Sequence, residues 1–220
     1  MNLLAIDTST SSTVLGLTKG GIVVDHSVRD IRKHSREILQ SISALLAEAE
    51  LTLRELDGIV FGRGPGSFTG LRIAVGVVQG LAYGASLPVI PVSSMAVLAQ
   101  AMGIHKGHIF VALSARLEEI YYGTYQRKNG LVIASAAEGV RDVSDLDVAV
   151  VDDWRLVTDA PHLQDSISRS LGVSFSEVSN ETVPTVENLL TLGLQSQAKG
   201  GSISALDASP VYLREQVANR

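Results

Sequence analysis

The first residues whose types and spacing could do chemistry are Asp7, Thr8 and Ser9, which follow an apolar run near the N-terminus. A carboxylate at the end of a strand, followed by a turn rich in hydroxyl groups, can orient water bound to Mg²⁺ and can hold phosphate oxygens. The other interpretation is that these side chains only satisfy backbone groups of the turn itself. The spacing leaves both interpretations open.

The most informative segment runs from Gly62 to Arg72 and contains four glycines, at positions 62, 64, 66 and 70. Glycine adopts positive φ at no steric cost and lets another group approach the backbone closely. A helix that begins in such a turn can bind an anion. The spacing fits neither the P-loop nor the dinucleotide-binding fingerprint, and the segment contains no lysine. A tight connection between a strand and a helix is the alternative.

The histidines and the serine of the glycine turn are weaker candidates. His105 and His108 are spaced i, i+3 with no acidic residue close by in the sequence, and no His-Glu-x-x-His motif is present. Ser67 lies in Gly-Ser-Phe-Thr-Gly, which is not the Gly-x-Ser-x-Gly elbow of hydrolases. We therefore expect neither a metal site nor a catalytic nucleophile in this chain.

Composition excludes several classes of protein. The absence of cysteine rules out disulfides and thiolate metal sites and fits a reducing cytosol. No apolar run is long enough to span a bilayer and no signal peptide is evident, so we expect a cytoplasmic protein without membrane contact. The formal net charge of −5 predicts weak or no binding of nucleic acid by the chain alone. In the first half, the only local basic cluster comprises Arg29, Arg32, Lys33 and Arg36.

The elements that must position these residues follow from hydrophobic periodicity. The first half has the pattern of strands at 3–6, 13–18, 22–25, 58–62 and 89–90, and of helices at 35–50, 69–86 and 93–102. The second half has the pattern of strands at 109–113, 120–125, 131–134 and 148–151, and of helices at 161–171 and 185–198. We predict an α/β fold of duplicated βββαβα halves, residues 1–103 and 104–220, with the final residues free to return to the first.

The duplication pairs Asp7 with Ser114, which directly follows the first predicted strand of the second half. A serine cannot replace a carboxylate in metal or proton chemistry. If two mirrored loops once held a nucleotide between them, the second has lost its acid. This asymmetry argues against the main alternative function, a stand-alone ATPase or kinase.

The chain resembles the TsaB (YeaZ) family in segments that follow one another along nearly its whole length. The segment Gly64–Arg72 is the most specific of them. The sequence departs from the family pattern at Arg36, where the family has Glu, and at Ser114, where it has Asp. The matching segments are Leu4–Ser9, His34-Ser35, Gly64–Arg72, Pro91–Ser94, Ala115-Arg116, Glu119–Tyr121 and Pro210–Arg214.

The resemblance implies an actin/Hsp70/sugar-kinase-like (ASKHA) fold. It implies a non-catalytic dimerisation subunit of the machinery that makes N6-threonylcarbamoyladenosine (t6A) at adenosine 37 of tRNAs reading ANN codons. The expected partners are a TsaD-like transferase, a TsaE-like ATPase and, for the chain alone, a second copy in a homodimer. The chain would bind no cofactor itself, ATP and Mg²⁺ being used by the complex, and would meet tRNA only through the complex. Asp7, Thr8 and Ser9 would then be a vestigial nucleotide-binding turn.

The helix at 69–86 carries Gly76, Gly80 and Gly84 on one face, because they recur at every fourth position. Each glycine costs about 1 kcal/mol relative to alanine in a helix interior, so close packing against something must compensate. One interpretation is packing inside the domain, against its own sheet or the helix at 35–50. The other, which the resemblance favours, is a contact with a helix of a partner. The predicted partner-binding residues are Ile42, Leu45, Ile73, Gly76, Val77, Gly80 and Gly84.

Overall fold

The computed structural model describes residues 1–28 and 31–214, except for the side chains of residues 31–36. The chain forms two compact units. Unit 1 comprises Met1–Val97 and Pro184–Val211, and unit 2 comprises Leu98–Val183 and the segment from Tyr212 on. This division differs from the predicted halves in that a long segment after residue 183 belongs to the first unit.

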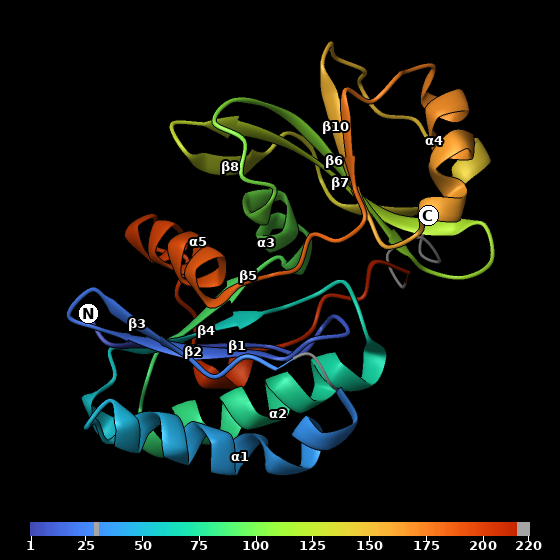
Figure 1. Ribbon diagram of the computed structural model, residues 1–220. Coiled ribbons are helices and arrows are strands. Elements are labelled where there is room, and N and C mark those ends of the chain that lie inside the picture. Colours follow the sequence, from blue (N-terminus) through green and yellow to red (C-terminus); the bar gives the residue numbers. More distant parts are fainter. Residues whose placement is uncertain (29–30, 215–220) are drawn as a thin grey trace. The chain divides into compact units, whose positions relative to one another are not determined.

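Unit 1 is built on a five-stranded sheet in the order β3-β2-β1-β4-β5 (Figure 1). The strands β1 (Leu3–Asp7), β2 (Val14–Lys19) and β3 (Ile22–Asp25) form an antiparallel meander. The strands β4 (Gly58–Gly62) and β5 (Val89–Val92) run parallel to β1. Every residue of β1 and β4 is buried, as expected for central strands that are covered on both faces.

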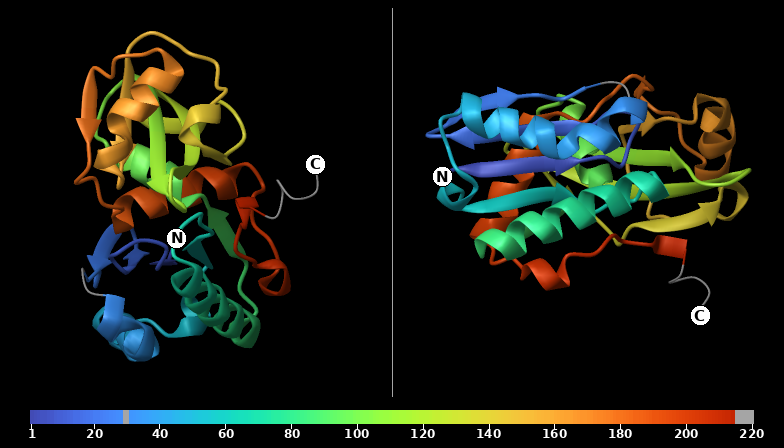
Figure 2. Two further views of the ribbon diagram at one scale, coloured as in Figure 1. Left: turned by 90° about the vertical axis from the view of Figure 1, so that its right-hand side faces the viewer. Right: turned by 90° about the horizontal axis from the view of Figure 1, so that it is seen from below.

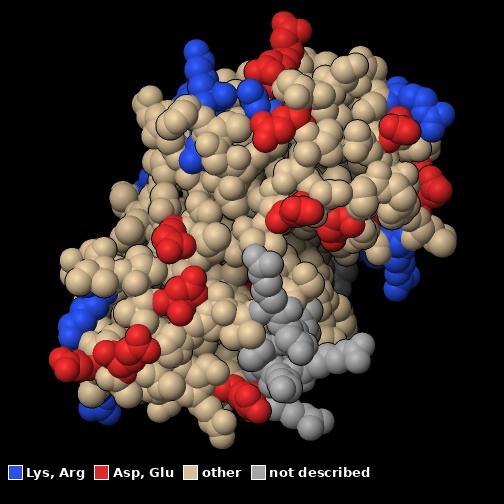
Figure 3. Space-filling model, viewed as in Figure 1, with Lys and Arg blue, Asp and Glu red and all other residues tan. Residues whose placement is uncertain are grey.

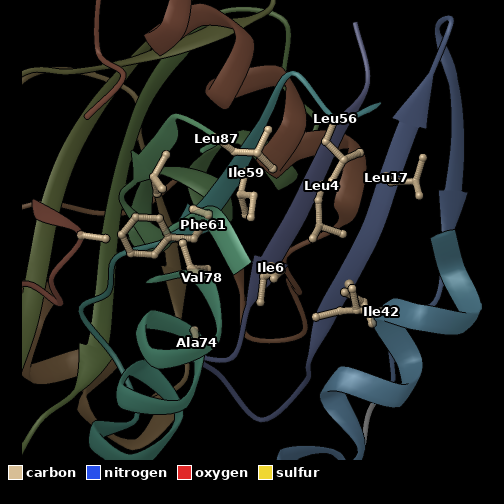
Figure 4. Close-up of a cluster of buried hydrophobic side chains, with 14 of the residues drawn as sticks. Leu4, Ile6, Leu17, Ile42, Leu56, Ile59, Phe61, Ala74, Val78 and Leu87 are labelled. Atoms are coloured by element: carbon tan, nitrogen blue, oxygen red, sulfur yellow. The ribbon is translucent and has the colours of Figure 1, made fainter. Parts of the chain in front are cut away.

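Helices α1 (Ile31–Glu48) and α2 (Phe68–Ala85) lie side by side on one face of this sheet, and α5 (Val186–Ala198) covers the other (Figures 1 and 2). Short 3₁₀ turns lie at Leu53–Glu55 (η1) and Ala205–Asp207 (η4). The main core fills the layer between the sheet and the two helices (Figure 4). Its largest members include Leu4, Ile6, Leu15, Leu17, Ile38, Ile42, Leu45, Ile59, Phe61 and Val78.

Helix α5 packs on the sheet of unit 1. The expectation that it completes the second half is wrong. A Cβ atom added at Gly16 of β2 would lie 2.5 Å from Cγ1 of Val186, and one added at Gly193 would lie 2.5 Å from Cγ1 of Val60 in β4. Glycine on the strand at one contact and on the helix at the other therefore lets α5 pack closely on the sheet.

Unit 2 contains a six-stranded sheet in which the order β11-β10-β6-β7-β8 repeats the order of unit 1, with β9 pairing to β7. As in unit 1, the first three strands, β6, β7 and β8, form an antiparallel meander, and two later strands, β10 and β11, run parallel to β6. The predicted duplication is therefore confirmed at the level of strand topology. The strands are β6 (Gly107–Ser114), β7 (Glu119–Lys128), β8 (Leu131–Ala134), β9 (Gly139–Asp142), β10 (Trp154–Thr158) and β11 (Glu177–Ser179).

The remaining helical elements are α3 (Ser94–Ala101), α4 (Gln164–Leu171), η2 (Val143–Asp145) and η3 (Pro161–Leu163). Helix α3 follows β5, and the division between the units falls within it. Helix α4 packs on the second sheet through Ile167 and Leu171, which join Phe110, Trp154 and Leu156 in a separate core. Across the described ranges, no helix is both long and apolar enough to cross a membrane.

The second half departs from its predicted plan between β8 and β10. The strand expected at 148–151 lies outside the strands, and the strand that pairs with β6 is β10, a few residues later. Val148 and Val151 are apolar because they pack against the second core from a loop. Where unit 1 has α1, the described chain here has only β9 and the η2 turn.

Candidate functional site

Asp7 and the glycine turn meet at one edge of the first sheet. Strands β1 and β4 are parallel, with Ile6 opposite Phe61, so both strands end at the same edge. The Asp7 side chain packs there directly against Gly62, where an added Cβ would lie 2.0 Å from Oδ2 of Asp7. Asp7 is only 1% exposed, so this carboxyl group is part of the protein interior.

Both oxygens of the Asp7 carboxylate accept hydrogen bonds from the protein. Oδ1 accepts from the backbone N–H of Ser9 at 2.7 Å, and Oδ2 accepts from the hydroxyl of Ser94 at 2.9 Å. The Ser94 hydroxyl in turn accepts from the N–H of Gly64 at 3.2 Å. Burial raises the pKa of Asp7, and the hydrogen bonds from Ser9 and Ser94 offset this only in part. A buried carboxyl group with a raised pKa and both oxygens occupied does not fit Mg²⁺, which needs ionised oxygen ligands and usually keeps several waters.

The two residues after Asp7 are bonded to the start of α2. The Thr8 hydroxyl donates to the carbonyl of Gly70 at 2.6 Å, and the N–H of Ser67 donates to the carbonyl of Ser9 at 2.7 Å. A Cβ added at Gly70 would lie 1.8 Å from the carbonyl oxygen of Thr8. A Cβ added at Gly66 would lie 2.3 Å from the carbonyl oxygen of Ser9. The glycines of this turn therefore admit the backbone of the β1–β2 turn. The interpretation as a tight connection accounts for them without a bound anion.

The corresponding edge of the second sheet does carry an acid, although it is not at the position of Asp7. The N–H and the hydroxyl of Ser114 both donate to Oδ1 of Asp159, at 2.6 and 3.0 Å. Asp159 follows β10, the counterpart of β4, and its side chain is exposed. The loop after β6 has no acid at the position of Asp7, as the sequence indicates, but Asp159 brings a carboxylate to the same edge from the end of the neighbouring strand, which sequence reasoning missed. The sequence signal for Asp159 is its position directly after a strand. Because periodicity predicts the strand at 148–151 and not at Trp154–Thr158, this signal goes undetected in the sequence.

The glycine stripe of α2 is open to solvent. Gly76, Gly80 and Gly84 are exposed, and a Cβ added at any of them would meet no heavy atom of the described residues within 4 Å. Figure 2, in the view from below, shows α2 between α1 and the segment that contains η4. The interpretation that the stripe packs inside the domain is therefore wrong for the described part of the chain. The described residues of unit 1 do not supply the packing that would compensate for three helical glycines.

Large side chains flank the stripe on the same side of α2. Phe68 is 55% exposed and Tyr83 is 69% exposed. The guanidinium carbon of Arg72 lies 3.5 Å from the centre of the Phe68 ring. Sequence reasoning missed these residues. The spacing of four residues between the glycines extends toward the N-terminus to positions 72 and 68. We call the set Phe68, Arg72, Gly76, Gly80, Tyr83 and Gly84 the open face of α2.

Four predicted partner-binding residues lie elsewhere. Ile42 is 2% exposed and Leu45 is 0% exposed, and both pack in the core beneath α1. Their prediction as contact residues is wrong, because the apolar stripe of α1 faces the sheet. Ile73 and Val77 are partly buried and pack against the same core, at the margin of the open face of α2.

The segment around η4 borders the open face of α2 on its other side. The side-chain amide of Gln79 donates to the carbonyl of Ala208 at 2.8 Å, which ties this segment to α2. Ala205 and Ala208 are buried in the core of unit 1, whereas Leu206 between them is exposed.

Charged side chains of opposite sign are mixed on the face of the molecule drawn in Figure 3, where Lys and Arg atoms lie scattered among Asp and Glu atoms. The side chains of Arg32, Lys33 and Arg36, and all of Arg29, lie outside the described residues, as does the side chain of His34. Among the residues whose side chains the structure describes, no three His, Asp or Glu residues lie close enough together to hold a metal ion.

Two of the matching segments meet in unit 2. The guanidinium of Arg214 forms a bidentate ion pair with Glu119, with nitrogen–oxygen distances of 2.5 and 3.4 Å. The hydrogen bond from this guanidinium to Glu119 raises the pKa of Arg214. The pair fixes the segment from Tyr212 on to the start of β7, which explains why the two segments carry these residue types.

Comparisons with known proteins agree with this architecture. The family model described as TsaD, tRNA N6-adenosine threonylcarbamoyltransferase, matches residues 7–200. The chain is 33% identical to the tRNA threonylcarbamoyladenosine biosynthesis protein TsaB of Escherichia coli K12, covering 99% of this chain and 96% of that protein. Its identity to the Haemophilus influenzae protein of the same name is 32%, covering 99% and 95%.

The fold comparison gives the same result. The structure of YeaZ from Pseudomonas aeruginosa superposes with a TM-score of 0.86 at 35% identity, covering 96% of this chain and 99% of that chain. Together with the repeated strand order of the two sheets, this confirms the predicted actin/Hsp70/sugar-kinase-like fold. The family match extends over most of the chain, and the chain belongs to the TsaB family of tRNA threonylcarbamoyladenosine biosynthesis proteins.

Proposed function

We propose that this chain is a non-catalytic subunit that binds a TsaD-like transferase through the open face of α2. With that transferase and a TsaE-like ATPase, it supports threonylcarbamoyl transfer to adenosine 37 of tRNAs that read ANN codons. In the absence of the transferase, the same face pairs two copies of the chain in a homodimer. The observation that carries this proposal is the exposed glycine stripe of α2, which packing against the described residues of unit 1 does not explain.

The stripe suits the close approach of a second helix. Helix axes usually pack about 8–10 Å apart, and the distance depends on the side chains at the contact. Glycine at three successive contact positions permits the short end of that range. Phe68, Arg72 and Tyr83 border the glycines, and aromatic residues and arginine are enriched among the residues that dominate interface energies. The open face of α2 thus combines a shallow centre with larger groups at its ends.

A transferase of the TsaD family suits the role of partner because of its own fold. The TsaD family model matches this chain over residues 7–200, so such a partner would contain a helix equivalent to α2. Two equivalent helices can pack against each other about an approximate twofold axis, as identical surfaces do in symmetric dimers. This symmetry explains why a second copy of the chain and a TsaD-like partner would compete for one surface.

The Asp7 turn supports a role without independent catalysis. Asp7 is buried, and both its oxygens accept hydrogen bonds from the protein. The chain would accordingly hold no nucleotide or metal of its own, and the ATP and Mg²⁺ that the complex uses would bind to other subunits. The exposed Asp159 beside Ser114 is the one observation that favours the alternative, a stand-alone ATPase or kinase. An assay for Mg²⁺-dependent ATP hydrolysis by the wild-type chain and by Asp159→Asn distinguishes the two functions.

We further propose that tRNA reaches this chain only through the complex, in the cytoplasm. The net charge of −5 supports this, because tight binding of nucleic acid depends on releasing counterions from phosphates. An electrophoretic shift series with tRNA across salt concentrations should show weak binding by the chain alone. Tight, salt-sensitive binding by the chain alone would make it a direct reader of tRNA.

The proposed function is tested by a reconstituted transfer assay. A TsaD-family transferase, a TsaE-like ATPase and tRNA are supplied with threonylcarbamoyl donor, with and without this chain. Transfer should depend on the chain, and the transferase should co-purify with it in a pull-down. Equal transfer in its absence, or robust ATP hydrolysis by the chain alone that Asp7→Asn abolishes, would contradict the proposal.

A further inference from the structure

We propose that Thr8 is a positioning residue for partner binding: its hydroxyl fixes the first turn of α2 and, with it, the Phe68–Arg72 pair. The inference rests on the proposed function, because it treats the open face of α2 as the binding surface. It gives the Asp7–Ser9 turn a role that differs from nucleotide binding.

The geometry begins at the N-terminus of α2. The helix starts at Phe68, with Ser67 as its N-cap, and the Ser67 hydroxyl accepts from the N–H of Gly70 at 3.2 Å. The β1–β2 turn contacts this first helical turn at two points. The Thr8 hydroxyl donates to the carbonyl of Gly70 at 2.6 Å, and the Ser9 carbonyl accepts from the N–H of Ser67 at 2.7 Å. The turn therefore holds the helix start on both sides of Phe68.

The first turn of a helix needs such a tether more than its middle does. The first N–H groups of a helix lack partners within the helix, so helix ends fray unless other groups hold them. In α2 that end carries Phe68, whose ring lies against the guanidinium of Arg72. Displacement of the first turn would move this pair out of line with Gly76 and Gly80. A partner that contacts the whole open face would then bind only those molecules in which the first turn of α2 is in place.

The direction of the Thr8 hydrogen bond distinguishes this role from phosphate binding. The hydroxyl donates to a carbonyl of the protein at a distance typical of a good O–H···O bond. An added Cβ at Gly70 would lie 1.8 Å from the Thr8 carbonyl oxygen, so the backbones of the two segments are also in contact. Thr8 is thus committed to α2 through both its hydroxyl and its backbone.

The test compares variants of Thr8 that differ in the hydroxyl group. Thr8→Val keeps the shape and removes the hydroxyl, Thr8→Ala is a second variant without it, and Thr8→Ser restores it. Affinity for a TsaD-family transferase is measured by isothermal titration calorimetry on the full chain. Hydrogen exchange of the segment 67–74 is measured on the free chain, and thermal unfolding confirms that each variant is folded.

Thr8→Val and Thr8→Ala should bind about three- to tenfold more weakly, the range that corresponds to one hydrogen bond of ordinary net strength. Their amide exchange should increase in 67–74, while Thr8→Ser should match the wild type in both measurements. Gly80→Leu is the control for the surface itself and should abolish binding without faster exchange in 67–74.

The outcomes separate the inference from the function on which it rests. Unchanged affinity in folded Thr8→Val and Thr8→Ala, with binding lost in Gly80→Leu, would overturn the positioning role alone. Equal losses in Thr8→Ser and Thr8→Val would also overturn it, because the hydroxyl would then be irrelevant. Full binding by Gly80→Leu would remove the proposed surface and the inference together.

Discussion

The glycines of the turn and the glycines of α2 stand next to each other in the sequence and serve opposite purposes. In and beside the turn, a Cβ added at Gly62, Gly66 or Gly70 would lie between 1.8 and 2.3 Å from an atom of Asp7, Ser9 or Thr8, respectively. In the middle and at the end of α2, a Cβ added at Gly76, Gly80 or Gly84 would meet nothing within 4 Å among the described residues. Among the described residues, the first set makes room for a neighbouring segment, and the second set contacts no other part of the chain.

This difference shows what a glycine pattern can and cannot reveal. Both sets look alike in sequence, since each lowers side-chain bulk at regular positions. Only the surroundings tell whether a glycine makes room for its own chain or leaves room for another. A glycine within a helix lowers the stability of the free protein. Where no packing in the free protein compensates for this loss, the glycine indicates a contact with another molecule.

The largest expected effect is the loss of stability in Gly70→Ala. The new Cβ would lie 1.8 Å from the carbonyl oxygen of Thr8, and neither backbone can move without breaking the bonds that join them. The free energy of unfolding should fall by about 3 kcal/mol, at the upper end of the range for overpacking. Urea denaturation measures it. A loss below about 1 kcal/mol would mean that the two segments can shift apart at little cost. The difference between these glycines and the glycine stripe of α2 would then be smaller than proposed.

The next largest expected effect is a dependence of stability on pH that comes from Asp7, whose carboxyl group packs against Gly62. Because the folded state raises the pKa of Asp7 above its unfolded value, the native state binds the extra proton. The stabilisation is therefore complete below the ordinary aspartate pKa and is lost as the pH rises through the raised value. Asp7→Asn cannot titrate, so the stability of wild type relative to this variant should fall with pH across that window. The slope should be at most about 1.4 kcal/mol per pH unit.

Urea unfolding of both proteins over a series of pH values measures this difference and cancels the contribution of the other acids. A difference that is constant with pH, or that rises with it, would show that Asp7 is ionised in the folded chain. The buried carboxyl would then be closer to the metal-binding interpretation than to the structural one.

The smallest effect is a gain in stability at the other set of glycines. Gly76→Ala and Gly84→Ala each place a methyl group in open space on a helix, so each should stabilise the isolated chain by about 0.5–1 kcal/mol. Denaturation of the monomer at low concentration measures this gain. Destabilisation by either substitution would reveal an internal contact of the stripe and would erase the contrast between the two sets.

The sequence predicted most of the fold because hydrophobic periodicity records which faces are buried. The strand meanders, the two long helices of unit 1 and the repeat of the plan all follow from it. The strand expected at 148–151 failed because Val148 and Val151 pack against a core from a loop, and periodicity does not distinguish that from a strand. The placement of α5 on the first sheet failed because it depends on contacts between residues distant in the sequence, such as Gly193 with Val60.

The candidate site was predictable only in part. The spacing of Gly76, Gly80 and Gly84 placed them on one face, as the structure confirms, but it did not say which way that face points. The prediction of Ile42 and Leu45 as partner-binding residues is wrong because their spacing is that of a stripe that faces the core. The partnership of Thr8 with Gly70, and that of Ser114 with Asp159, are long-range contacts that no local pattern encodes.

The central claim is that the glycine stripe of α2 serves the contact with a partner at the expense of stability. The most direct measurement is made on Gly80→Leu, recording the unfolding free energy of the monomer and the affinity for a TsaD-family transferase. The two should change in opposite directions, with stability higher by about 1 kcal/mol and binding lost, because leucine favours the helix and holds the partner helix away. Unchanged affinity in this stably folded variant would contradict the claim.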